Sequence, residues 1–532
     1  MAEEKINKKY EVAQVRKTYL RAYEPWNLEE DKALQESYRS YLANIPRKPY
    51  GDFVEKTAGE FKRNDGAIRS RLVKLLGSPL PHEHSASKAV TEETSPTVHA
   101  ISKDIEISPE FKKALDYMEK TSEHLFVTGR AGTGKSTLLS HFREITKKKI
   151  AVVAPTGVAA LNVAGQTIHS FFGFGIDVTP KTVRPPQGKR AQVIKNLESL
   201  VIDEVSMVRA DLLDCVDRAL RLSRGKPHIP FGDVQIIFIG DVYQLPPVVT
   251  EEAEEIFNGH YPSPYFFDAN VMRLIRYNFL ELQKVYRQQD EHFIRLLNSV
   301  RSGIVTEEEL ALLNIRYIKK ENDEKPEDFS VALTTRTALA ESINLEKLRG
   351  LKTPLISFRG SLGGNFKEKS LPTAENLQLK VGAQVMLLNN DTRHRWVNGT
   401  LGKITKVKEG EEGGELTIQL QNGNSVAVET HTWDMVEHYY DTKAKNIAAR
   451  SVGSFTQFPV KLAWAVTIHK AQGKTFDRVV IDIGEGTFAH GQMYVALSRC
   501  RTLEGISLRK PIEKKHIFID ERVVEFIKKH FA

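Results

Sequence analysis

Four short apolar runs rich in β-branched residues lie in the first half of the chain, at residues 124–128, 149–154, 199–203 and 234–240. Apolar and polar positions do not alternate within these runs, which is typical of parallel strands that are buried on both faces of a sheet. Helical or loop segments separate the runs, so the pattern predicts an α/β fold. Polar residues follow the ends of several runs, and this edge of an open parallel sheet is where ligands bind.

A second α/β pattern begins near Leu280, with apolar strands expected at residues 331–333 and 479–482. Between these strands, residues 396–456 carry short extended runs separated by turn sequences such as Asn422-Gly423. Because Asn-Gly between extended runs is typical of hairpins, we expect a small antiparallel β-barrel inserted into a second parallel-sheet domain. The expected domains are 105–279 with a small wedge insertion near 173–196, then 280–395 together with 457–532, and the inserted barrel at 396–456.

Residues 1–77 are expected to form an N-terminal helical module, because the apolar positions between Pro25 and Gly77 predict three helices around a small core. The last expected helix is basic, as a recognition helix in a DNA groove would be. A solvated charged face on a protein-docking module explains the same residues. The basic residues are Arg63, Arg69, Arg71 and Lys74. Residues 78–104 contain too few large apolar side chains to offset the entropy of ordering, so they predict a flexible linker.

Composition narrows the class of protein only moderately. The 532 residues include 76 Lys and Arg against 68 Asp and Glu, and the net charge of +8 permits a polyanionic partner without indicating nucleic acid. Cys215 and Cys500 are too few for a disulfide framework or a cysteine zinc cluster, and they favour a reducing compartment. The opening residues lack an apolar signal core, and no run of about 18 apolar residues occurs. We therefore expect a cytoplasmic protein without a membrane partner, nucleoid-associated if the source is bacterial.

Residues 129–136, Gly-Arg-Ala-Gly-Thr-Gly-Lys-Ser, have the full spacing of a phosphate loop, and the apolar run before them supplies its strand. Glycine tolerates positive φ and close approach, so Gly129 and Gly134 can bracket backbone N–H groups that surround phosphate oxygens. Lys135 is expected to reach the β- and γ-phosphates, and Ser136 to bind Mg²⁺. An ordinary glycine turn explains neither the Lys-Ser pair nor its spacing. The sequence therefore predicts a site for a nucleoside triphosphate with Mg²⁺.

Five further residues can act on that nucleotide. Asp203 can hold Mg²⁺ through a water, and Glu204 can orient and deprotonate the attacking water, although an acidic helix cap would look the same. Gln244, after the fourth apolar run, can hydrogen-bond the γ-phosphate or the attacking water. Hydrolysis also needs positive charge on the transferring phosphoryl group, and Arg287 and Arg499 are candidates from the second domain. Taken singly, either arginine would be read as a surface residue.

Seven segments occur in the order and form of the Pif-type DNA helicases, relatives of RecD in the 5′-to-3′ branch of helicase superfamily one. They are Gly129–Thr137, Ala154–Phe172, Val201–Met207, Gly240–Val248, Tyr286–Gly303, Val460–Asp482 and Gly491–Arg501. The chain resembles this family over about residues 105–510. The resemblance implies two RecA-like domains that close on ATP and Mg²⁺ in the cleft between them, with single-stranded DNA across their top.

The resemblance also implies roles for individual residues. The nucleotide-binding set is Gly129, Ala131, Gly132, Thr133, Gly134, Lys135, Ser136, Thr137 and Gly473, with Ser136 and Asp203 on the metal. The catalytic set is Lys135, Glu204, Gln244, Arg287 and Arg499. The DNA-binding set is Pro155, Thr156, Gly157, His169, Phe172, Thr467, His469 and Lys470. Hydroxyls, histidines and backbone amides suit phosphate contacts, and aromatic rings can stack on any base, although either histidine alone could be a core residue.

The implied function is ATP-dependent unwinding of forked or tailed duplex DNA during 5′-to-3′ movement on single-stranded DNA, in replication, repair or recombination. The alternative is a DNA-stimulated translocase that remodels protein–DNA complexes, recruited by its N-terminal module through a replication or repair protein. A phosphate-loop kinase acting on small molecules does not explain the two late arginine motifs.

The chain departs from the family pattern at one position ahead of the phosphate loop. The family usually carries a glutamine there that reads the adenine edge, and Phe111 stands in its place here. The resemblance therefore does not carry base selectivity over to this chain.

Overall fold

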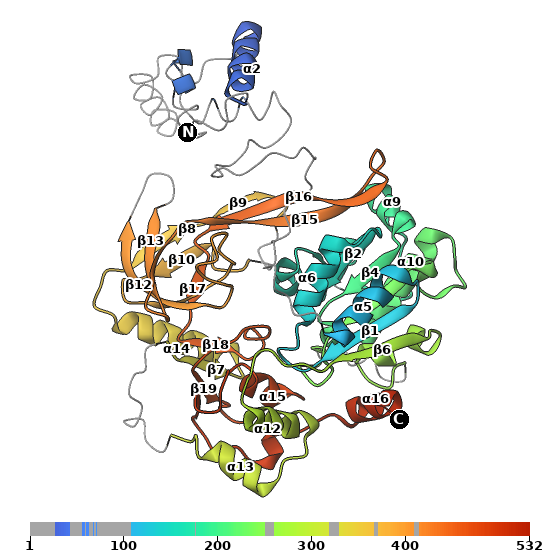
Figure 1. The fold of residues 1–532 in the computed structure, drawn as a ribbon, viewed down its shortest axis with the longest axis vertical. Coiled ribbons are helices and arrows are strands. Elements are labelled where there is room, and N and C mark those ends of the chain that lie inside the picture. Colours follow the sequence, from blue (N-terminus) through green and yellow to red (C-terminus); the bar gives the residue numbers. More distant parts are fainter. Residues whose placement is uncertain are drawn as a thin grey trace. The chain divides into compact units, whose positions relative to one another are not determined.

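The computed structural model describes residues 27–42, 56–58, 60–62, 68, 71, 108–175, 177–249, 260–318, 329–366, 371–408 and 414–531. The chain divides into two compact units, Met1–Thr94 and Ser95–Ala532, whose elements are labelled in Figure 1. Among the residues just given, no helix has the length and apolar content needed to cross a bilayer.

The first unit contains the helix α2 (Leu28–Leu42). Leu34 and Tyr38 on this helix are buried, and Arg71 Nε donates a hydrogen bond to Asp31 Oδ1 at 2.6 Å. The segment that contains Arg71 therefore packs against α2. The described residues do not test the prediction of three helices. They also exclude the linker 78–104 and the basic residues Arg63, Arg69 and Lys74.

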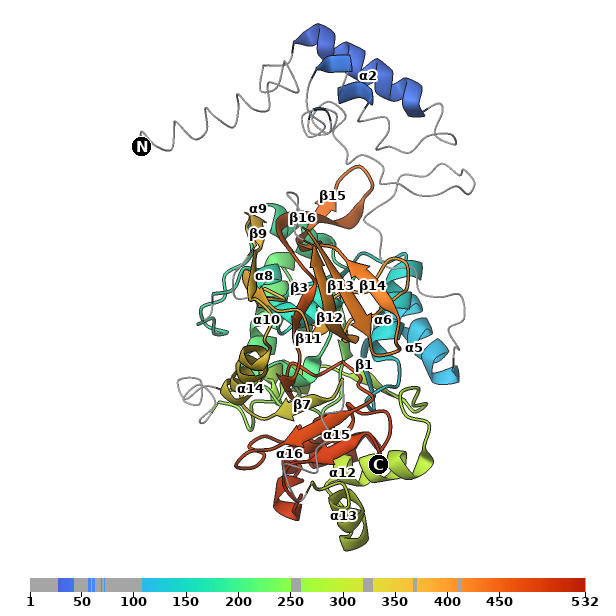
Figure 2. The ribbon, with the colours of Figure 1, turned by 90° about the vertical axis from the view of Figure 1, so that its left-hand side faces the viewer.

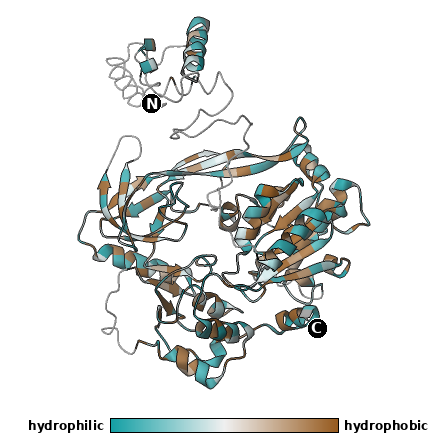
Figure 3. Ribbon diagram, viewed as in Figure 1, coloured by the Kyte–Doolittle hydropathy of each residue, from teal (hydrophilic) through white to brown (hydrophobic). Residues whose placement is uncertain are grey.

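The second unit begins with a six-stranded parallel sheet in the order β3-β2-β4-β5-β1-β6. Its strands are β1 (His124–Gly129), β2 (Ile150–Ala154), β3 (Gln166–Thr167), β4 (Ser199–Ile202), β5 (Gln235–Ile239) and β6 (Tyr277–Leu282). All of its strand pairs are parallel, as the uninterrupted apolar runs predicted. Apolar residues run along these strands (Figure 3).

Helices cover both faces of this sheet (Figure 2). They are α5 (Pro109–Lys120), α6 (Lys135–Ile145), α7 (Gly157–Asn162), α8 (Ile168–Phe172), α9 (Gly188–Asn196) and α10 (Ala210–Arg224). Leu125 and Val127 of β1 pack in one apolar core with α5 and α6. Phe126, which points the opposite way, packs in a second core with α8, α9 and α10. We call this sheet and its helices the first lobe.

The second lobe is built on a smaller parallel sheet in the order β18-β7-β19-β20. Its strands are β7 (Val331–Thr334), β18 (Ala465–Thr467), β19 (Val479–Asp482) and β20 (Ile506–Leu508). Its helices are α12 (Glu291–Ser302), α13 (Glu307–Asn314), α14 (Thr337–Gly350) and α15 (Gln492–Leu497). The unit is thus an α/β structure with two parallel sheets of the RecA-like kind.

Antiparallel strands lie between β7 and β18 in sequence. A five-stranded sheet has the order β14-β13-β12-β11-β17, a three-stranded sheet has the order β15-β16-β9, and β10 pairs with β8. The strands are β8 (Ile356–Arg359), β9 (Ser361–Gly364), β10 (Asn376–Leu379), β11 (Gln384–Leu387), β12 (Leu401–Lys408), β13 (Glu415–Leu420), β14 (Ser425–Val428), β15 (His431–Asp441), β16 (Asn446–Gln457) and β17 (Val460–Leu462). The antiparallel region is therefore larger than the expected 396–456, because β8 to β11 and β17 belong to it.

Two elements lie in a different lobe from the one expected. The boundary placed at residue 280 cuts through β6, which pairs with β1 and so belongs to the first lobe. The helix α16 (Glu521–Phe531) was expected in the second domain, yet Phe526 is buried in the first-lobe core and stacks on Phe267 at a centroid distance of 4.2 Å. The chain therefore returns to the first lobe at its C-terminal helix.

The long hairpin β15–β16 reaches from the antiparallel region to the first lobe (Figure 1). The backbone N–H of His438 donates to Gln166 Oε1 at 3.1 Å, and His438 Nδ1 lies 2.7 Å from the same oxygen. Glu437 forms ion pairs with Arg190 of α9 at 3.6 Å and with Arg450 of β16 at 2.8 Å. The hairpin is thereby fixed on α9, which occupies the expected wedge segment, and on β3.

Candidate active site

The phosphate loop connects β1 to α6, as its spacing predicted. Gly129, Gly132 and Gly134 adopt positive φ angles of 154°, 82° and 88°, and a Cβ added at Gly132 would lie 2.4 Å from the Cβ of Arg287. Lys135 Nζ donates to the carbonyl oxygens of Gly129 at 2.6 Å and Arg130 at 3.1 Å. A lysine held over the loop by neutral carbonyl groups, beside backbone amides, fits a polyphosphate.

Asp203 and Glu204 directly follow β4, at the same sheet edge as the phosphate loop. Burial raises the pKa of Asp203 to about 7, and the neighbouring Glu204 charge adds to this effect. Burial also raises the pKa of Glu204, while the charges of Lys135 and Arg499 oppose the rise. Glu204 has a φ of 49°, which is uncommon for a residue with a side chain and typical of functional sites. Asp203, together with the Ser136 hydroxyl at the start of α6, is a donor set that suits Mg²⁺.

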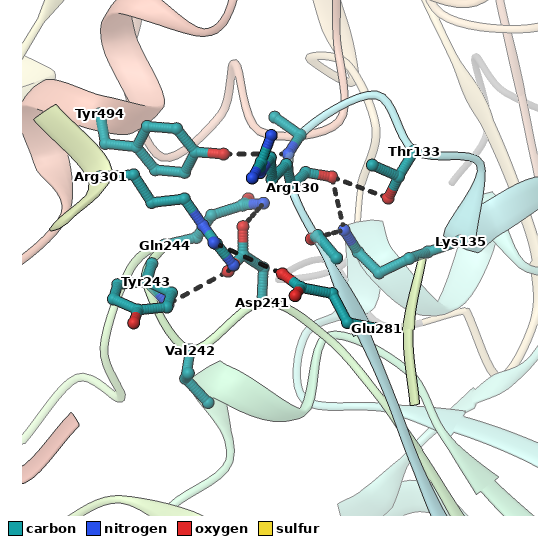
Figure 4. Close-up of polar contacts among 12 residues, drawn as sticks. Arg130, Thr133, Lys135, Asp241, Val242, Tyr243, Gln244, Glu281, Arg301 and Tyr494 are labelled. Atoms are coloured by element: carbon teal, nitrogen blue, oxygen red, sulfur yellow. Dashed lines mark hydrogen bonds and ion pairs between the residues drawn. The ribbon is translucent and has the colours of Figure 1, made fainter. Parts of the chain in front are cut away.

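Asp241 follows β5, is buried, and forms polar contacts with three residues (Figure 4). It accepts hydrogen bonds from Gln244 Nε2 at 3.1 Å, from the Tyr243 N–H at 3.2 Å and from Arg301 Nη2 at 3.1 Å. Arg301 also pairs with Glu281 at 3.5 Å and lies over the Tyr243 ring. Burial alone would raise the pKa of Asp241. The charges of Arg301 and Lys135 outweigh this effect and hold that pKa below its usual value. Asp241 therefore fixes the loop that carries Gln244.

A cavity of about 1010 Å³ lies between the two lobes at the phosphate loop. It is lined by Phe111, Ala131, Gly132, Thr133, Gly134, Lys135, Ser136, Thr137, Glu204, Gln244, Tyr286, Arg287, Gln289, Asp290, Gly473, Thr475, Arg499, Arg501 and Thr502. Every expected catalytic residue is in this set, and so is every expected nucleotide-binding residue except Gly129, whose carbonyl oxygen holds Lys135. Asp203, the neighbour of the lining residue Glu204 in the chain, is buried and does not line the cavity.

Both candidate arginines reach the cavity, and both are engaged by the second lobe. Arg287 Nη1 donates to the Ser498 carbonyl oxygen at 3.2 Å. Arg499 is 1 % exposed and donates from Nε to the Val495 carbonyl oxygen at 2.9 Å and from Nη2 to Ser498 Oγ at 2.8 Å. Burial and the charge of Arg287 lower the pKa of Arg499 to about 9. Arg499 thus reaches the cavity from the second lobe, and Arg287 reaches it beside Gly132 of the phosphate loop.

Sequence reasoning missed the groups that join the lobes at the site. The Ala131 N–H donates to the hydroxyl oxygen of Tyr494 on α15 at 3.0 Å. Gln472 Nε2 donates to Glu204 Oε2 at 3.1 Å and to Gln244 Oε1 at 3.3 Å. Both residues lie within segments that carry the family resemblance, but nothing in the local sequence shows which atoms they contact.

Comparison with known proteins decides the family. Residues 106–310 match the PIF1-like helicase family, and residues 366–407 match the 2B domain of the DNA helicase Pif1. The ATP-dependent DNA helicase Pif1 of Bdellovibrio bacteriovorus is 33% identical over 437 residues, which are 80% of this chain and 92% of that protein. The chain belongs to the PIF1-like helicase family. It is an ATP-dependent DNA helicase.

Two solved structures of a Pif1 from Bacteroides sp. resemble this PIF1-like helicase. The complex with ADP-AlF4 has a TM-score of 0.74 at 37% identity, and covers 80% of this chain and 97% of that one. The complex with single-stranded DNA has the same identity and coverage and a TM-score of 0.59. The unliganded Bacteroides structure also has a TM-score of 0.74, so the higher score is not particular to the nucleotide complex.

The expected DNA-binding residues of the first lobe of this helicase follow β2 and surround α8. Pro155 and Thr156 lie at the end of β2, and Gly157 begins α7. His169 is half-buried, with its ring edge-on to Phe174 at 6.4 Å. Phe172 is only 3 % exposed and packs in the first-lobe core, so little of its ring is accessible for stacking on a base.

In the second lobe, the expected DNA-binding residues follow β18. Thr467 is buried and its Oγ1 accepts from the Lys470 N–H at 3.3 Å, whereas the Lys470 side chain is exposed. His469 stacks with Phe488 at a centroid distance of 6.4 Å, and burial lowers its pKa. The sequence did not point to Asn398, although it accepts from Lys474 Nζ at 2.7 Å and donates to Asn162 Oδ1 at 3.3 Å. Asn398 thereby links this region of the PIF1-like helicase to α7 of the first lobe.

Proposed function

We propose that this helicase moves 5′ to 3′ along single-stranded DNA and separates forked or tailed duplexes ahead of it, in replication, repair or recombination. One observation supports this proposal most strongly. The cavity at the phosphate loop has walls from both lobes, so the nucleotide can draw them together and its hydrolysis can release them. Such closure, combined with strand contacts on each lobe, would advance the strand by a small step in each cycle.

In this proposal, Lys135 and the amides of residues 131–137 bind the phosphates of ATP, and Gly473 faces the nucleotide from the second lobe. Glu204 takes the proton of the attacking water, and Gln244 orients that water beside it. Arg287 and Arg499 stabilise the charge that develops on the transferring phosphoryl group. Mg²⁺, held by Ser136 and by Asp203 through a water, would neutralise phosphate charge when bound.

For the DNA strand, we propose contacts from Pro155, Thr156, Gly157 and His169 on the first lobe and from Thr467, His469 and Lys470 on the second. Gly157 and Thr167 line a small cavity of about 40 Å³ with residues of β15, so the antiparallel region faces this part of the first lobe. We propose that the five-stranded sheet forms the small barrel of this region. Its hairpin can then form one side of the strand channel.

The experiment is strand displacement on duplexes with either a 5′ or a 3′ single-stranded tail. We expect unwinding with ATP and Mg²⁺ on the 5′-tailed substrate and little on the 3′-tailed one. Lys135→Ala is expected to abolish both DNA-stimulated hydrolysis and unwinding without unfolding the protein. Unwinding from the 3′ tail alone, or full unwinding by Lys135→Ala, would refute the proposal.

The second candidate function is a translocase that the N-terminal module recruits through a replication or repair protein. The division of the chain at Thr94 favours an independently built N-terminal unit. Unwinding can be compared in the full chain and in a form that lacks residues 1–94. Equal unwinding by both forms supports the first proposal, in which residues after Thr94 unwind DNA by themselves. Loss of unwinding after the deletion supports the second proposal, in which the N-terminal module recruits the protein.

A further inference from the structure

Lys474 follows β18 in a turn where its backbone and its side chain meet different parts of the molecule. Its neighbours Gly473 and Thr475 line the nucleotide cavity, and its carbonyl oxygen accepts from Arg499 Nη1 at 3.3 Å. Lys474 itself is not among the described residues that line the cavity. Its Nζ donates instead to Asn398 Oδ1 at 2.7 Å, in the loop between β11 and β12. The backbone of Lys474 therefore adjoins the nucleotide site, whereas its ammonium group lies outside the cavity.

Lys461 approaches the same turn from β17. It pairs with Met386 of β11 in an antiparallel ladder, so both side chains lie on one face of the sheet. Met386 packs in an apolar core with Ala471, whose carbonyl oxygen accepts from the Lys474 N–H at 3.0 Å. The side chain of Lys461 therefore lies on the face of the sheet that packs against this turn.

Lys461, Lys470 and Lys474 gather there, and we call them the lysine cluster. Burial and the charges of Lys474 and Lys470 lower the pKa of Lys461 to about 7, and burial lowers the pKa of Lys474 to about 8. Among the described residues, no carboxylate opposes either shift. A half-buried cation without a counter-ion is unfavourable, and two such cations side by side are more so. The lysine cluster therefore suits an anion.

The lysine cluster lies near proposed strand contacts on both lobes. Lys470, its exposed member, is itself such a contact on the second lobe. Asn398, which holds Lys474, also donates to Asn162 Oδ1 at 3.3 Å. Asn162 ends α7, the short helix that begins at the proposed strand contact Gly157. An anion at the lysine cluster would thus lie along the strand and outside the nucleotide cavity.

We propose that the lysine cluster binds a phosphate group of the single-stranded DNA, and that Lys474 couples this contact to the nucleotide site. This inference rests on the proposed function and adds Lys461 and Lys474 to its strand contacts. Contacts to phosphate carry no base information, as a motor that moves along any sequence requires. The bound phosphate supplies the negative charge that the surrounding side chains do not.

The coupling runs through the turn that carries Lys474. Gln472 in the same turn donates to Glu204 Oε2 at 3.1 Å, and the Lys474 carbonyl oxygen holds Arg499. A phosphate that fixes the Lys474 side chain therefore restrains the turn that positions both the general base and an arginine of the nucleotide site. The strand thereby favours the arrangement in which hydrolysis occurs.

The first test measures binding of a fluorescent oligothymidylate to the full chain over a range of KCl concentrations. For single strands, log K falls with log [salt] by about 0.7 for each phosphate contact. The double variant Lys461→Gln with Lys474→Gln should therefore have a slope shallower by about 0.7 and an affinity about tenfold lower. Lys120→Gln is the matched control, because Lys120 is exposed and already paired with Asp116 at 2.7 Å. It should bind as the wild type does.

The second test separates a binding role from a structural one. Without DNA, Lys461→Gln removes an uncompensated cation, so its Tm should rise above that of the wild type although its DNA affinity is lower. A 5′-tailed duplex with one uncharged methylphosphonate, moved along the tail, identifies the phosphate concerned. The wild type should lose affinity at that position, and the double variant should lose none there.

The third test measures kcat of hydrolysis at saturating single-stranded DNA. Lys474→Gln should fall below Lys461→Gln by about twofold to thirtyfold, because only Lys474 belongs to the turn that holds Arg499. Equal kcat values would overturn the coupling. Unchanged slope and affinity in the double variant, or a lower Tm of Lys461→Gln, would overturn the phosphate site. If the wild type binds no single-stranded DNA, the proposed function itself fails, whereas normal binding by wild type and variants alike refutes only this inference.

Discussion

The hydroxyl oxygen of Tyr494 accepts a hydrogen bond from the backbone N–H of Ala131 at 3.0 Å. Ala131 belongs to the phosphate loop of the first lobe, and Tyr494 belongs to α15 of the second. The contact is buried, so the second lobe holds the backbone of the very loop that receives the nucleotide. The two lobes are therefore joined at the phosphate loop itself (Figure 4).

Tyr494→Phe tests this coupling because it removes the acceptor and keeps the ring. A buried N–H without a partner costs about 1–3 kcal/mol, so we expect the closed arrangement to weaken and the kcat of DNA-stimulated hydrolysis to fall by about tenfold. Nucleotide affinity measured without DNA should change less than kcat, since the phosphate contacts come from the first lobe. Unchanged DNA-stimulated hydrolysis in Tyr494→Phe would contradict the role given to this contact.

Gln472 provides a second link between the lobes, because its Nε2 donates to both Glu204 and Gln244. Gln472→Ala should reduce the stimulation of hydrolysis by single-stranded DNA by about tenfold, a loss of about 1.4 kcal/mol, while the hydrolysis rate without DNA changes little. Gln472→Glu should be worse, because a carboxylate beside Glu204 raises the pKa of the general base further. The measurement is kcat with and without DNA. Equal stimulation in the wild type and Gln472→Ala would show that the link is incidental.

The buried ion pair of Arg301 and Asp241 is expected to stabilise the protein, because each charge is the partner of the other. Breaking a buried ion pair leaves an unpaired charge, so Arg301→Met should cost about 3–5 kcal/mol of unfolding free energy. The double variant Arg301→Met with Asp241→Asn removes both charges and should recover part of this loss. Denaturant unfolding of the three proteins, combined as a double-mutant cycle, measures the coupling. Additive effects of the two substitutions would mean that the pair contributes nothing beyond its separate members.

Local sequence predicted the chemistry at the strand ends well, and predicted long-range pairing poorly. Lys135, Glu204 and Gln244 each follow an apolar strand in a recognisable local pattern, whereas Arg499 became more than a surface candidate only through the family resemblance. The structure brings all four into one cavity. The position of β6 depends on pairing with β1, about 150 residues earlier in the chain, which no local pattern encodes.

The packing of the C-terminal helix α16 and of Phe172 could not be predicted from the local sequence either. The apolar side chains of α16 predict only a buried face, and that face packs on the first lobe although the preceding strand lies in the second. An aromatic residue in a strand-binding segment is equally suited to a core and to stacking on DNA, and only the packing of α8 distinguishes the two. The location of α16 and the burial of Phe172 therefore depend on tertiary contacts, which the local sequence does not encode.

The contact of His438 with Gln166 is expected to make stability depend on pH. Burial and the charge of Arg143 lower the pKa of His438 to about 4, whereas a histidine in the unfolded chain titrates at about 6.5. Below about 6.5 the unfolded state binds a proton that the folded state does not. The stability from burying the neutral ring is therefore complete above pH 6.5 and is lost as the pH falls toward 4.

His438→Asn isolates this contribution, because asparagine keeps an N–H donor for Gln166 Oε1 and does not titrate. Between pH 7.5 and pH 5.0 the wild type should lose about 2 kcal/mol of unfolding free energy more than the variant, from about 1.4 kcal/mol for each pH unit below 6.5. Urea denaturation at the two pH values measures this difference. Other buried histidines, such as His124, whose pKa burial lowers to about 4, are present in both proteins and cancel in the comparison. If His438→Asn lost as much stability as the wild type on acidification, the hairpin contact would not be the pH-sensitive element, because the titrating group would then lie elsewhere in the chain.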